Sequence, residues 1–314
     1  MRVLITGVAG FCGPHLVKRL RQEGDVEIAG LDIAPAEVLR CGLDHYFQAD
    51  ICDRAAVASR VADFCPDSIF HLAGMSAGSP AMGAVCAVNV IGVLNVLEAV
   101  RQNAPDCRLL ITGSAAEYGM VPVSSLPVTE EAPCRPAGAY GASKYAATLI
   151  VIDYVRRSEI KAVVVRPFNI IGSGIPATLV VGALMARAKE ALASAGAPLI
   201  RVGDSDSERD FIAVSDAMDA YVRLLHAEPW GEVVNICSGR SWPIHRVAHA
   251  LVANSPRSIH VVLDPDLFPP SPVRRIYGSN EKARRLIGFE PATSLEQALK
   301  TVWDSEMGMA AKCA

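Results

Sequence analysis

Residues 2–13 read RVLITGVAGFCG, and this stretch decides which fold the sequence predicts. The apolar run RVLIT has the composition of a buried strand, and the amphipathic stretch HLVKRLRQEG, which begins at His15, has the pattern of a helix. Between them, Gly7 permits a tight turn, Gly10 lets backbone N–H groups approach a pyrophosphate, and Gly13 lets the helix lie close to the sheet. The stretch predicts a dinucleotide-binding unit, although its spacing is GxxGxxG rather than the commoner GxGxxG.

An acidic residue ends the next predicted strand, EIAGLD. The carboxylate of this residue, Asp32, would accept hydrogen bonds from both adenosine ribose hydroxyls, and its charge would repel a 2′-phosphate. The sequence therefore favours NAD as the cofactor, with NADP as the alternative.

Apolar segments rich in Val and Ile alternate with helical segments along the chain. The predicted strands are RVLITG, EIAGLD, DHYFQAD, SIFHLAG, RLLITGS, KAVVVRPFN and, much later, VVNICSG. The predicted helices lie near residues 14–23, 54–64, 84–104 and 140–157, and at VVGALMARAKEALASAG. Because strands that are apolar at successive positions need cover on both faces, we expect a doubly wound parallel sheet, a Rossmann-like α/β fold.

The pattern changes after RPFN, and it indicates a smaller C-terminal domain interleaved with the first. Residues 255–280 are rich in Pro and Arg and predict an irregular, lid-like segment rather than sheet. We expect a cleft between the two parts, beyond the carboxyl ends of the strands. The predicted boundaries are 1–168 with about 211–239 for the dinucleotide-binding domain, and 169–210 with 240–314 for the substrate domain.

Composition narrows the classes of partner. The 314 residues carry a formal net charge of −3, so nucleic acid and anionic membrane surfaces are not expected as main partners. The nine cysteines are scattered without a CxxC pair or a Cys/His cluster of metal-binding spacing, which favours free thiols in a reducing compartment and no metal site. We see neither a signal peptide nor a membrane span of roughly 20 apolar residues, and we expect a cytoplasmic protein.

Tyr140 and Lys144 stand four residues apart in the helical stretch YGASKYAATLIVIDYV, and so project from one helix face. A phenol beside an ammonium can transfer protons, because one cation at about 4 Å could lower the phenol pKa by roughly three units. Ser114 ends the strand RLLITGS, where its hydroxyl can bind a substrate carbonyl beside Tyr140. These three residues are the predicted catalytic set.

Together these motifs resemble a known family. GVAGFCG, Asp32, HLAG, NVIG, GSAAEYG, YGASK and RPFN are similar to the motifs of the extended short-chain dehydrogenase/reductases, the NAD-dependent epimerase/dehydratase family, over nearly the whole chain. In the second half, RPFNIIGSG, IRVGDSDSERDFIAVSDAMDAY and IYGSNEKARRLIGFEP resemble the GDP-4-keto-6-deoxy-D-mannose reductases. The resemblance implies an oxidoreductase that acts on a nucleotide sugar.

The resemblance also implies a role for individual residues. It implies cofactor binding by Gly7, Gly10, Phe11, Cys12, Gly13, Asp32, Asp50, Ile51, Leu72, Ala73, Gly74, Asn89, Tyr140, Lys144 and Pro167. It implies substrate binding by Ser76, Ser114, Asn169, Val180, Arg209 and Arg274. Arg209 also makes chemical sense by itself, since a guanidinium binds phosphate in a bidentate fork.

Some positions depart from related patterns. Sugar-nucleotide dehydratases of the superfamily place an acidic pair after the catalytic Ser or Thr, whereas this chain has Ala115 and Ala116, which disfavours dehydration. Glu117 comes one position later and, in an extended segment, would point to the opposite face. Pro269-Pro270 replaces an Arg-Pro pair, so one diphosphate-binding arginine is missing unless Arg274 or Arg275 replaces it.

Three functions remain open on these residues. The favoured one is reduction, by NAD(P)H, of the C4 keto group of a nucleotide-linked 4-keto-6-deoxy sugar, with a GDP-sugar preferred over CDP-, dTDP- and UDP-sugars. The alternatives are an NAD-dependent nucleotide-sugar 4-epimerase, which would use the same triad, and a non-catalytic dinucleotide-binding protein. The resemblance implies a homodimer through two helices, for which segments 84–104 and 140–157 have enough apolar surface.

Overall fold

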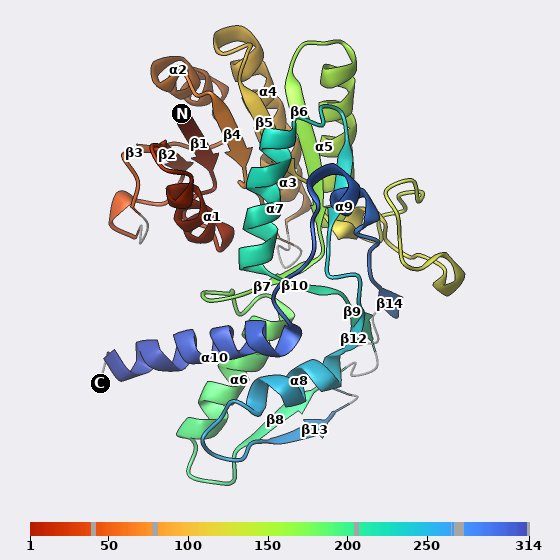
Figure 1. The fold of residues 1–314 in the computed structure, drawn as a ribbon. Helices are drawn as coiled ribbons and strands as arrows, with labels where there is room; N and C mark the ends of the chain where they lie inside the picture. Colours follow the sequence, from red (N-terminus) through yellow and green to blue (C-terminus); the bar gives the residue numbers. More distant parts are fainter. Residues whose placement is uncertain (39–41, 77–80, 204–206, 265, 267–272, 313–314) are drawn as a thin grey trace.

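The main sheet of the computed structural model has seven parallel strands in the order β11-β6-β5-β4-β1-β2-β3 (Figure 1). The structure describes residues 1–38, 42–76, 81–203, 207–264, 266 and 273–312. The strands are β1 (Arg2–Thr6), β2 (Glu27–Asp32), β3 (His45–Gln48), β4 (Ser68–His71), β5 (Arg108–Thr112), β6 (Lys161–Pro167) and β11 (Val233–Ile236). They coincide with the seven predicted strands, and the doubly wound fold is confirmed.

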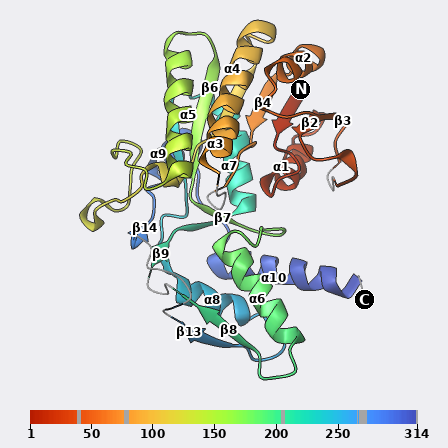
Figure 2. The same ribbon diagram turned by 180° about the vertical axis from the view of Figure 1, so that it is seen from behind.

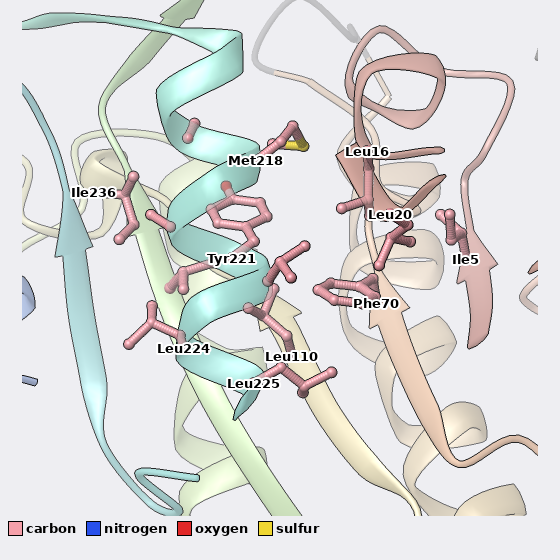
Figure 3. Close-up of a cluster of buried hydrophobic side chains, with 14 of the residues drawn as sticks. Ile5, Leu16, Leu20, Phe70, Leu110, Met218, Tyr221, Leu224, Leu225 and Ile236 are labelled. Carbon is pink, nitrogen blue, oxygen red and sulfur yellow. The ribbon is translucent and has the colours of Figure 1, made fainter. Parts of the chain in front are cut away.

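Helices cover both faces of this sheet (Figures 1 and 2). One group is α1 (Cys12–Leu20), α7 (Val214–Ala227) and α9 (Glu281–Ile287); the other is α2 (Arg54–Phe64), α4 (Gly92–Asn103) and α5 (Ala139–Arg156). Successive residues of β1 serve opposite faces: Ile5 lies in the core under α1 and α7, and Leu4 lies in the core under α2 and α4. Figure 3 shows the first core, in which Tyr221 of α7 lies among the aliphatic side chains that face the sheet.

Below the carboxyl ends of the strands lies a second unit with its own core (Figure 2). It contains β7 (Asn169–Ile171), α6 (Val180–Ala193), β8 (Leu199–Val202), β10 (Phe211–Ala213), α8 (Ile244–Val252), β13 (His260–Leu263) and α10 (Leu295–Lys312). A small sheet of β12 (Trp242–Pro243), β9 (Glu208–Arg209) and β14 (Arg275–Ile276) lies beside it. The short helical turns are η1 (Arg21–Glu23), η2 (Ala36–Val38), η4 (Ala115–Glu117) and η5 (Val123–Ser125).

The structure differs from the sequence predictions in two places. Segment 255–280 was expected to be irregular, but β13 pairs with β8 and β14 pairs with β9, because both strands find partners far away in the chain. The predicted boundaries put 240–314 in the substrate domain, yet Ala283, Ile287 and Phe289 belong to the core under α1 and α7. The chain therefore returns from the substrate unit to the dinucleotide-binding unit at residues 283–289.

A continuous helical run joins α3 (Met82–Cys86), the π-helical η3 (Ala87–Ile91) and α4. Its 22 residues, with a mean hydropathy of 1.9, are long and apolar enough to span a membrane by length and composition, which the sequence analysis did not anticipate. Half of the run is buried, and α4 packs against α2 and α5. A core helix of a doubly wound sheet produces the same apolar pattern.

Candidate active site

The glycine-rich turn after β1 leaves a cradle that a side chain would fill. Gly7 has a φ of +72°, and a Cβ there would lie 2.5 Å from the backbone nitrogen of Ala73, so the turns after β1 and β4 touch. At Gly13, a Cβ would lie 1.9 Å from the carbonyl oxygen of Val8, whereas at Gly10 the nearest atom is 3.1 Å away. Gly13 is thus required by the turn itself, and a Cβ at Gly10 would make a milder but still tight contact with the Gly7 carbonyl oxygen.

The N-terminus of α1 is available to an anion. Phe11 at the N-cap makes no side-chain capping hydrogen bond, and the first turn holds no acidic residue. A helix start of this kind presents N–H groups and a positive dipole end, which fits the pyrophosphate of a dinucleotide. The Phe11 ring packs against both cores, so only its backbone faces this space. Burial raises the pKa of the neighbouring Cys12 thiol to about 12, which keeps it neutral.

Asp32 is held at the end of β2 by the turn. Its carboxylate accepts hydrogen bonds from the backbone nitrogens of Ala9 at 2.9 Å and Ala34 at 3.1 Å, and the residue stays partly exposed. At the end of β3, Asp50 is exposed, and Ile51 is buried with its carbonyl bound by Asn95. The acids predicted for the adenosine side therefore lie at the same sheet edge as the turn.

The turn after β4 carries Leu72, Ala73 and Gly74 towards α5, and Asn89 holds it there. The Asn89 amide, fully buried in η3, accepts from the Met75 nitrogen at 2.8 Å and donates to the Ser143 hydroxyl at 3.0 Å. A Cβ on Gly74 would lie 3.0 Å from Lys144 Nζ. The predicted supporting role of Asn89 thus has a structural basis: it joins this turn to the helix that carries Tyr140 and Lys144.

The predicted catalytic residues come together at the carboxyl ends of β4, β5 and β6. Tyr140 and Lys144 lie in the first turns of α5, and the Ser114 side chain hydrogen-bonds that of Tyr140. Lys144 is 4% exposed, and its ammonium donates to the Thr112 carbonyl at 2.8 Å. Lys144 is thus bound to Thr112, the last residue of β5, and Ser114 lies in the turn that follows it.

The electrostatics of this pair differ from the sequence expectation. Burial raises the pKa of the Tyr140 phenol; the Ser114 hydrogen bond opposes the shift, and the Glu117 carboxylate adds to it. Burial also lowers the pKa of Lys144 to about 8. The expectation that the ammonium dominates and lowers the phenol pKa is wrong for this structure, because the cost of burying the charged phenolate is the largest cause of the shift and the Lys144 charge is not among the causes.

A cavity of about 570 Å³ lies where β6 leads into the second unit. Asn169, Val180 and Arg209, which the resemblance assigned to the substrate, all line it, as do Arg187 and Ser207. Asn169 is fixed by a 2.7 Å hydrogen bond from its amide to the Asp210 carbonyl. Pro167 is the last residue of β6 and lies two residues before Asn169 in the chain.

The other three predicted substrate residues, Ser114, Ser76 and Arg274, do not line the cavity. Ser76 is exposed on the turn after β4, and Arg274 is exposed just before β14. Arg274 still lies near Arg209, because β14 pairs with the strand that carries Arg209. Pro269 and Pro270 lie outside the described residues. Within the described part of the chain, no group of His, Cys, Asp and Glu side chains could hold a metal ion.

Three buried polar residues at the site were not assigned a role from the sequence. Asp210 accepts hydrogen bonds from Ser238, Gly239 and Gly278, and burial raises its pKa to about 6. His71 is fully buried at the end of β4, and burial lowers its pKa to about 3. Glu117 lies in the turn η4, not in an extended segment, and is fully buried. The sequence feature that could have identified them is an acidic residue or a histidine within or next to an apolar run.

Residues 3–237 match the NAD dependent epimerase/dehydratase family. The chain belongs to this family. As a family member, it is an NAD(P)-dependent enzyme of the extended short-chain dehydrogenase type, and the uncapped start of α1, the tight glycine turn before it and the buried lysine fit a bound dinucleotide.

Relatives with assigned activities cover the whole chain. A GDP-6-deoxy-D-mannose reductase from Pseudomonas aeruginosa is 29% identical over 315 residues, 98% of each chain. A UDP-glucose 4-epimerase from Mycolicibacterium smegmatis is 30% identical and covers 96% of this chain and 97% of its own. The structure of RMD from Pseudomonas aeruginosa complexed with NADPH superposes with a TM-score of 0.83 at 26% identity, covering 98% of this chain and 99% of that one. This family member is therefore similar to both reductases and epimerases.

Proposed function

We propose that the protein reduces the C4 keto group of a GDP-linked 4-keto-6-deoxy sugar with hydride from NAD(P)H. The observation that carries the proposal is that Ser114, Tyr140 and Lys144 gather where β5 ends and α5 begins. A cavity in the second unit, lined by Asn169 and Arg209, supplies a place for the nucleotide part of the substrate. A guanidinium on that wall suits the diphosphate of a nucleotide sugar. The full-length similarity to a GDP-6-deoxy-D-mannose reductase supports the choice of base and sugar.

Each residue of the triad has a distinct task in this reaction. When bound, the nicotinamide supplies the hydride that forms the new C–H bond at C4. Tyr140 donates its proton to the former carbonyl oxygen, and its raised pKa keeps it protonated at neutral pH, as a proton donor must be. Ser114 donates a hydrogen bond to the same oxygen, and the Lys144 ammonium stabilises negative charge on Tyr140 as the proton leaves.

A second candidate function is that of a nucleotide-sugar 4-epimerase, which would use the same triad. It is supported by the similarity of a UDP-glucose 4-epimerase over 96% of this chain. Turnover separates the two. A GDP-linked 4-keto-6-deoxy sugar should oxidise one NAD(P)H per sugar reduced, and the product should be a 6-deoxy sugar with a C4 hydroxyl. Interconversion of UDP-glucose and UDP-galactose without net cofactor consumption would instead establish the epimerase.

The nucleotide base is tested independently of turnover. GDP, CDP, dTDP and UDP are each added with NAD present, and the midpoint of thermal unfolding is measured. A ligand that binds only the folded state raises the midpoint in proportion to the logarithm of its concentration over Kd, so GDP should give the largest increase. A larger increase with UDP would overturn the choice of base.

We further propose a cytoplasmic homodimer. Two of the exposed large hydrophobic side chains, Ile91 and Leu149, lie on the two helical segments predicted for the interface, and Met82 lies just before the first of them, at the start of α3; they are 46%, 50% and 65% exposed. Figure 2 shows α3, α4 and α5 on one side of the sheet. Apolar side chains gathered on adjacent helices suit a twofold interface.

A further inference from the structure

Glu117 is the buried acid closest to the catalytic residues, and the family roles do not include it. Its side chain is fully buried between the turn η4, α5 and β6. Two glycines make room for it: a Cβ on Gly113 would lie 2.4 Å from Glu117 Oε1, and a Cβ on Gly141 would lie 2.4 Å from the Ala116 carbonyl oxygen. The fold is therefore built closely around this carboxylate.

The carboxylate binds three elements of the site at once. Oε1 accepts a hydrogen bond from the Ser114 nitrogen at 2.8 Å, and the Thr148 hydroxyl lies 3.2 Å from Oε1 and 3.1 Å from Oε2. The Arg166 Nε donates to Oε2 at 2.8 Å. Thr148 lies one helical turn beyond Lys144 on the same buried face of α5. The carboxylate thus joins the Ser114 turn, the helix of Tyr140 and Lys144, and the strand that leads to the cavity.

All three neighbours donate, which explains why a carboxylate suits this position. An ionised carboxylate accepts at both oxygens, whereas an amide would present an N–H group to one of the donors. The charge of Arg166 compensates that of Glu117, and Arg166 is held by a second donor as well: Nη1 binds the Tyr118 hydroxyl at 3.1 Å, and its guanidinium lies over the Tyr118 ring. Because it is fully buried and bound to these three donors, Glu117 is not exposed to a substrate proton.

We propose that Glu117 is a positioning residue for the catalytic triad: it fixes Ser114 relative to Tyr140 and Lys144, and it places a buried negative charge behind them. The proposal extends the proposed function, since it concerns the same triad. It assigns no proton transfer to Glu117 itself.

The charges around the triad allow a directional test. The Glu117 charge raises the pKa of both Tyr140 and Lys144. It adds to the effect of burial on Tyr140 and opposes the effect of burial on Lys144. Other titratable groups facing the set are Arg166 on β6 and Cys134 beside Glu117, Cys12 of α1 and Tyr221 of α7 near Tyr140, and His71 of β4 near Lys144. Because a negative charge disfavours the phenolate, its removal should make Tyr140 more acidic.

The main variant is Glu117→Gln, assayed for turnover across pH. We expect kcat to fall on the order of 10- to 100-fold as Ser114 loses its fixed position, with KM within about twofold of wild type. We also expect the alkaline limb of the kcat profile, where Tyr140 loses its proton, to move to lower pH. Thr148→Val keeps the charge and removes the bond to α5; it should lower kcat by about three- to tenfold and leave the limb in place.

Asp216→Asn is the matched control, because it removes another buried carboxylate, one that binds Thr293 and not the triad. Its kcat and pH profile should match wild type. Wild-type kcat and an unshifted limb in a folded Glu117→Gln protein would overturn the proposal, as would wild-type kcat in Thr148→Val. If the single charge change prevents folding, the double variant Glu117→Met/Arg166→Met removes both charges of the buried pair and carries the same two readouts.

A titration without substrate separates this proposal from the proposed function. The ultraviolet absorbance of phenolate is followed with pH in the substrate-free protein, and the curve of the Tyr140→Phe variant is subtracted to isolate Tyr140. Glu117→Gln should ionise Tyr140 at lower pH than wild type. This shift is expected even if the protein proves to be an epimerase, whereas an unchanged Tyr140 titration contradicts the electrostatic part of the proposal in either case.

Discussion

Burial, rather than the charge of the lysine, dominates the ionisation of the catalytic side chains. The phenol pKa of Tyr140 is raised and the pKa of Lys144 is lowered to about 8 by the same cause, loss of hydration. Tyr140 therefore begins the reaction as an acid. This state suits the reduction of a carbonyl, in which the oxygen must gain a proton.

The first prediction concerns the phenol oxygen. Tyr140→Phe removes the proton donor and keeps the ring, so kcat should fall by about 10²- to 10⁴-fold while NAD(P)H binding, measured by fluorescence titration, stays near wild type. Tyr145→Phe, on the same helix, is the control and should retain turnover. Full turnover by Tyr140→Phe with normal cofactor binding would remove the mechanism.

The second prediction concerns His71, a buried imidazole. Its Nδ1 lies 2.8 Å from the Thr6 hydroxyl, and burial followed by the Lys144 charge lowers its pKa from 6.5 to about 3. A depressed pKa means that the unfolded chain binds the proton first, so stability is present above pH 6.5 and is lost as the pH falls towards 3. At most, this group contributes about 1.4 kcal/mol per pH unit to the slope.

His71→Asn keeps a polar group near Thr6 and does not titrate. Its free energy of unfolding, measured by urea denaturation between pH 6.5 and 4, should fall less steeply than that of wild type. His260→Asn makes the same change at an exposed position on β13 and serves as the control. Equal slopes for wild type and His71→Asn would show that the imidazole is not the group that resists protonation.

At the scale of elements, the turn from β1 to α1 separates folding from cofactor binding. A Cβ at residue 13 would overlap the Val8 carbonyl, which belongs to the turn, at 1.9 Å, while a Cβ at residue 10 would lie 3.1 Å from the Gly7 carbonyl oxygen, a much milder contact. Two glycines three residues apart should therefore respond to the same substitution in different ways.

The third prediction uses this difference. Gly13→Ala should lower the midpoint of thermal unfolding by several degrees, because the turn must shift to relieve the overlap. Gly10→Ala should lower the midpoint less, because its Cβ would lie 3.1 Å from the Gly7 carbonyl oxygen, and should weaken cofactor binding at least about tenfold, measured by calorimetry, since backbone N–H groups lose close approach to the pyrophosphate. Equal effects on stability in both variants would contradict this division.

At the scale of the whole molecule, the second unit lies beyond the carboxyl ends of the strands and the proposed dimer face lies on α3 and α5 (Figure 2). The fourth prediction is that Ile91→Lys combined with Leu149→Lys converts the dimer to monomers in sedimentation velocity, because two lysines on each copy would face a buried apolar interface. The control, Leu263→Lys, changes an exposed apolar side chain of β13 and should leave the assembly intact. A monomeric wild-type protein would rule out the dimer.

The sequence by itself determined the seven-stranded fold and the dinucleotide turn, and it predicted the triad residues that the structure brings close together. These features depend on local pattern: glycines at fixed offsets, apolar strands, and a Tyr and a Lys one helical turn apart. The local pattern was insufficient where partners are distant, as for β13 and β14, whose pairing strands come from another part of the chain.

Only the tertiary structure decided the environment of the site. Glu117 reaches Thr148 and Arg166, which lie 31 and 49 residues further along the chain, so its role could not follow from its neighbours in sequence. The cavity that gathers Asn169, Val180 and Arg209 likewise exists only once β9 and α6 are packed together. The direction of the Tyr140 pKa shift was also decided there, because the hydration that a side chain loses depends on everything folded around it.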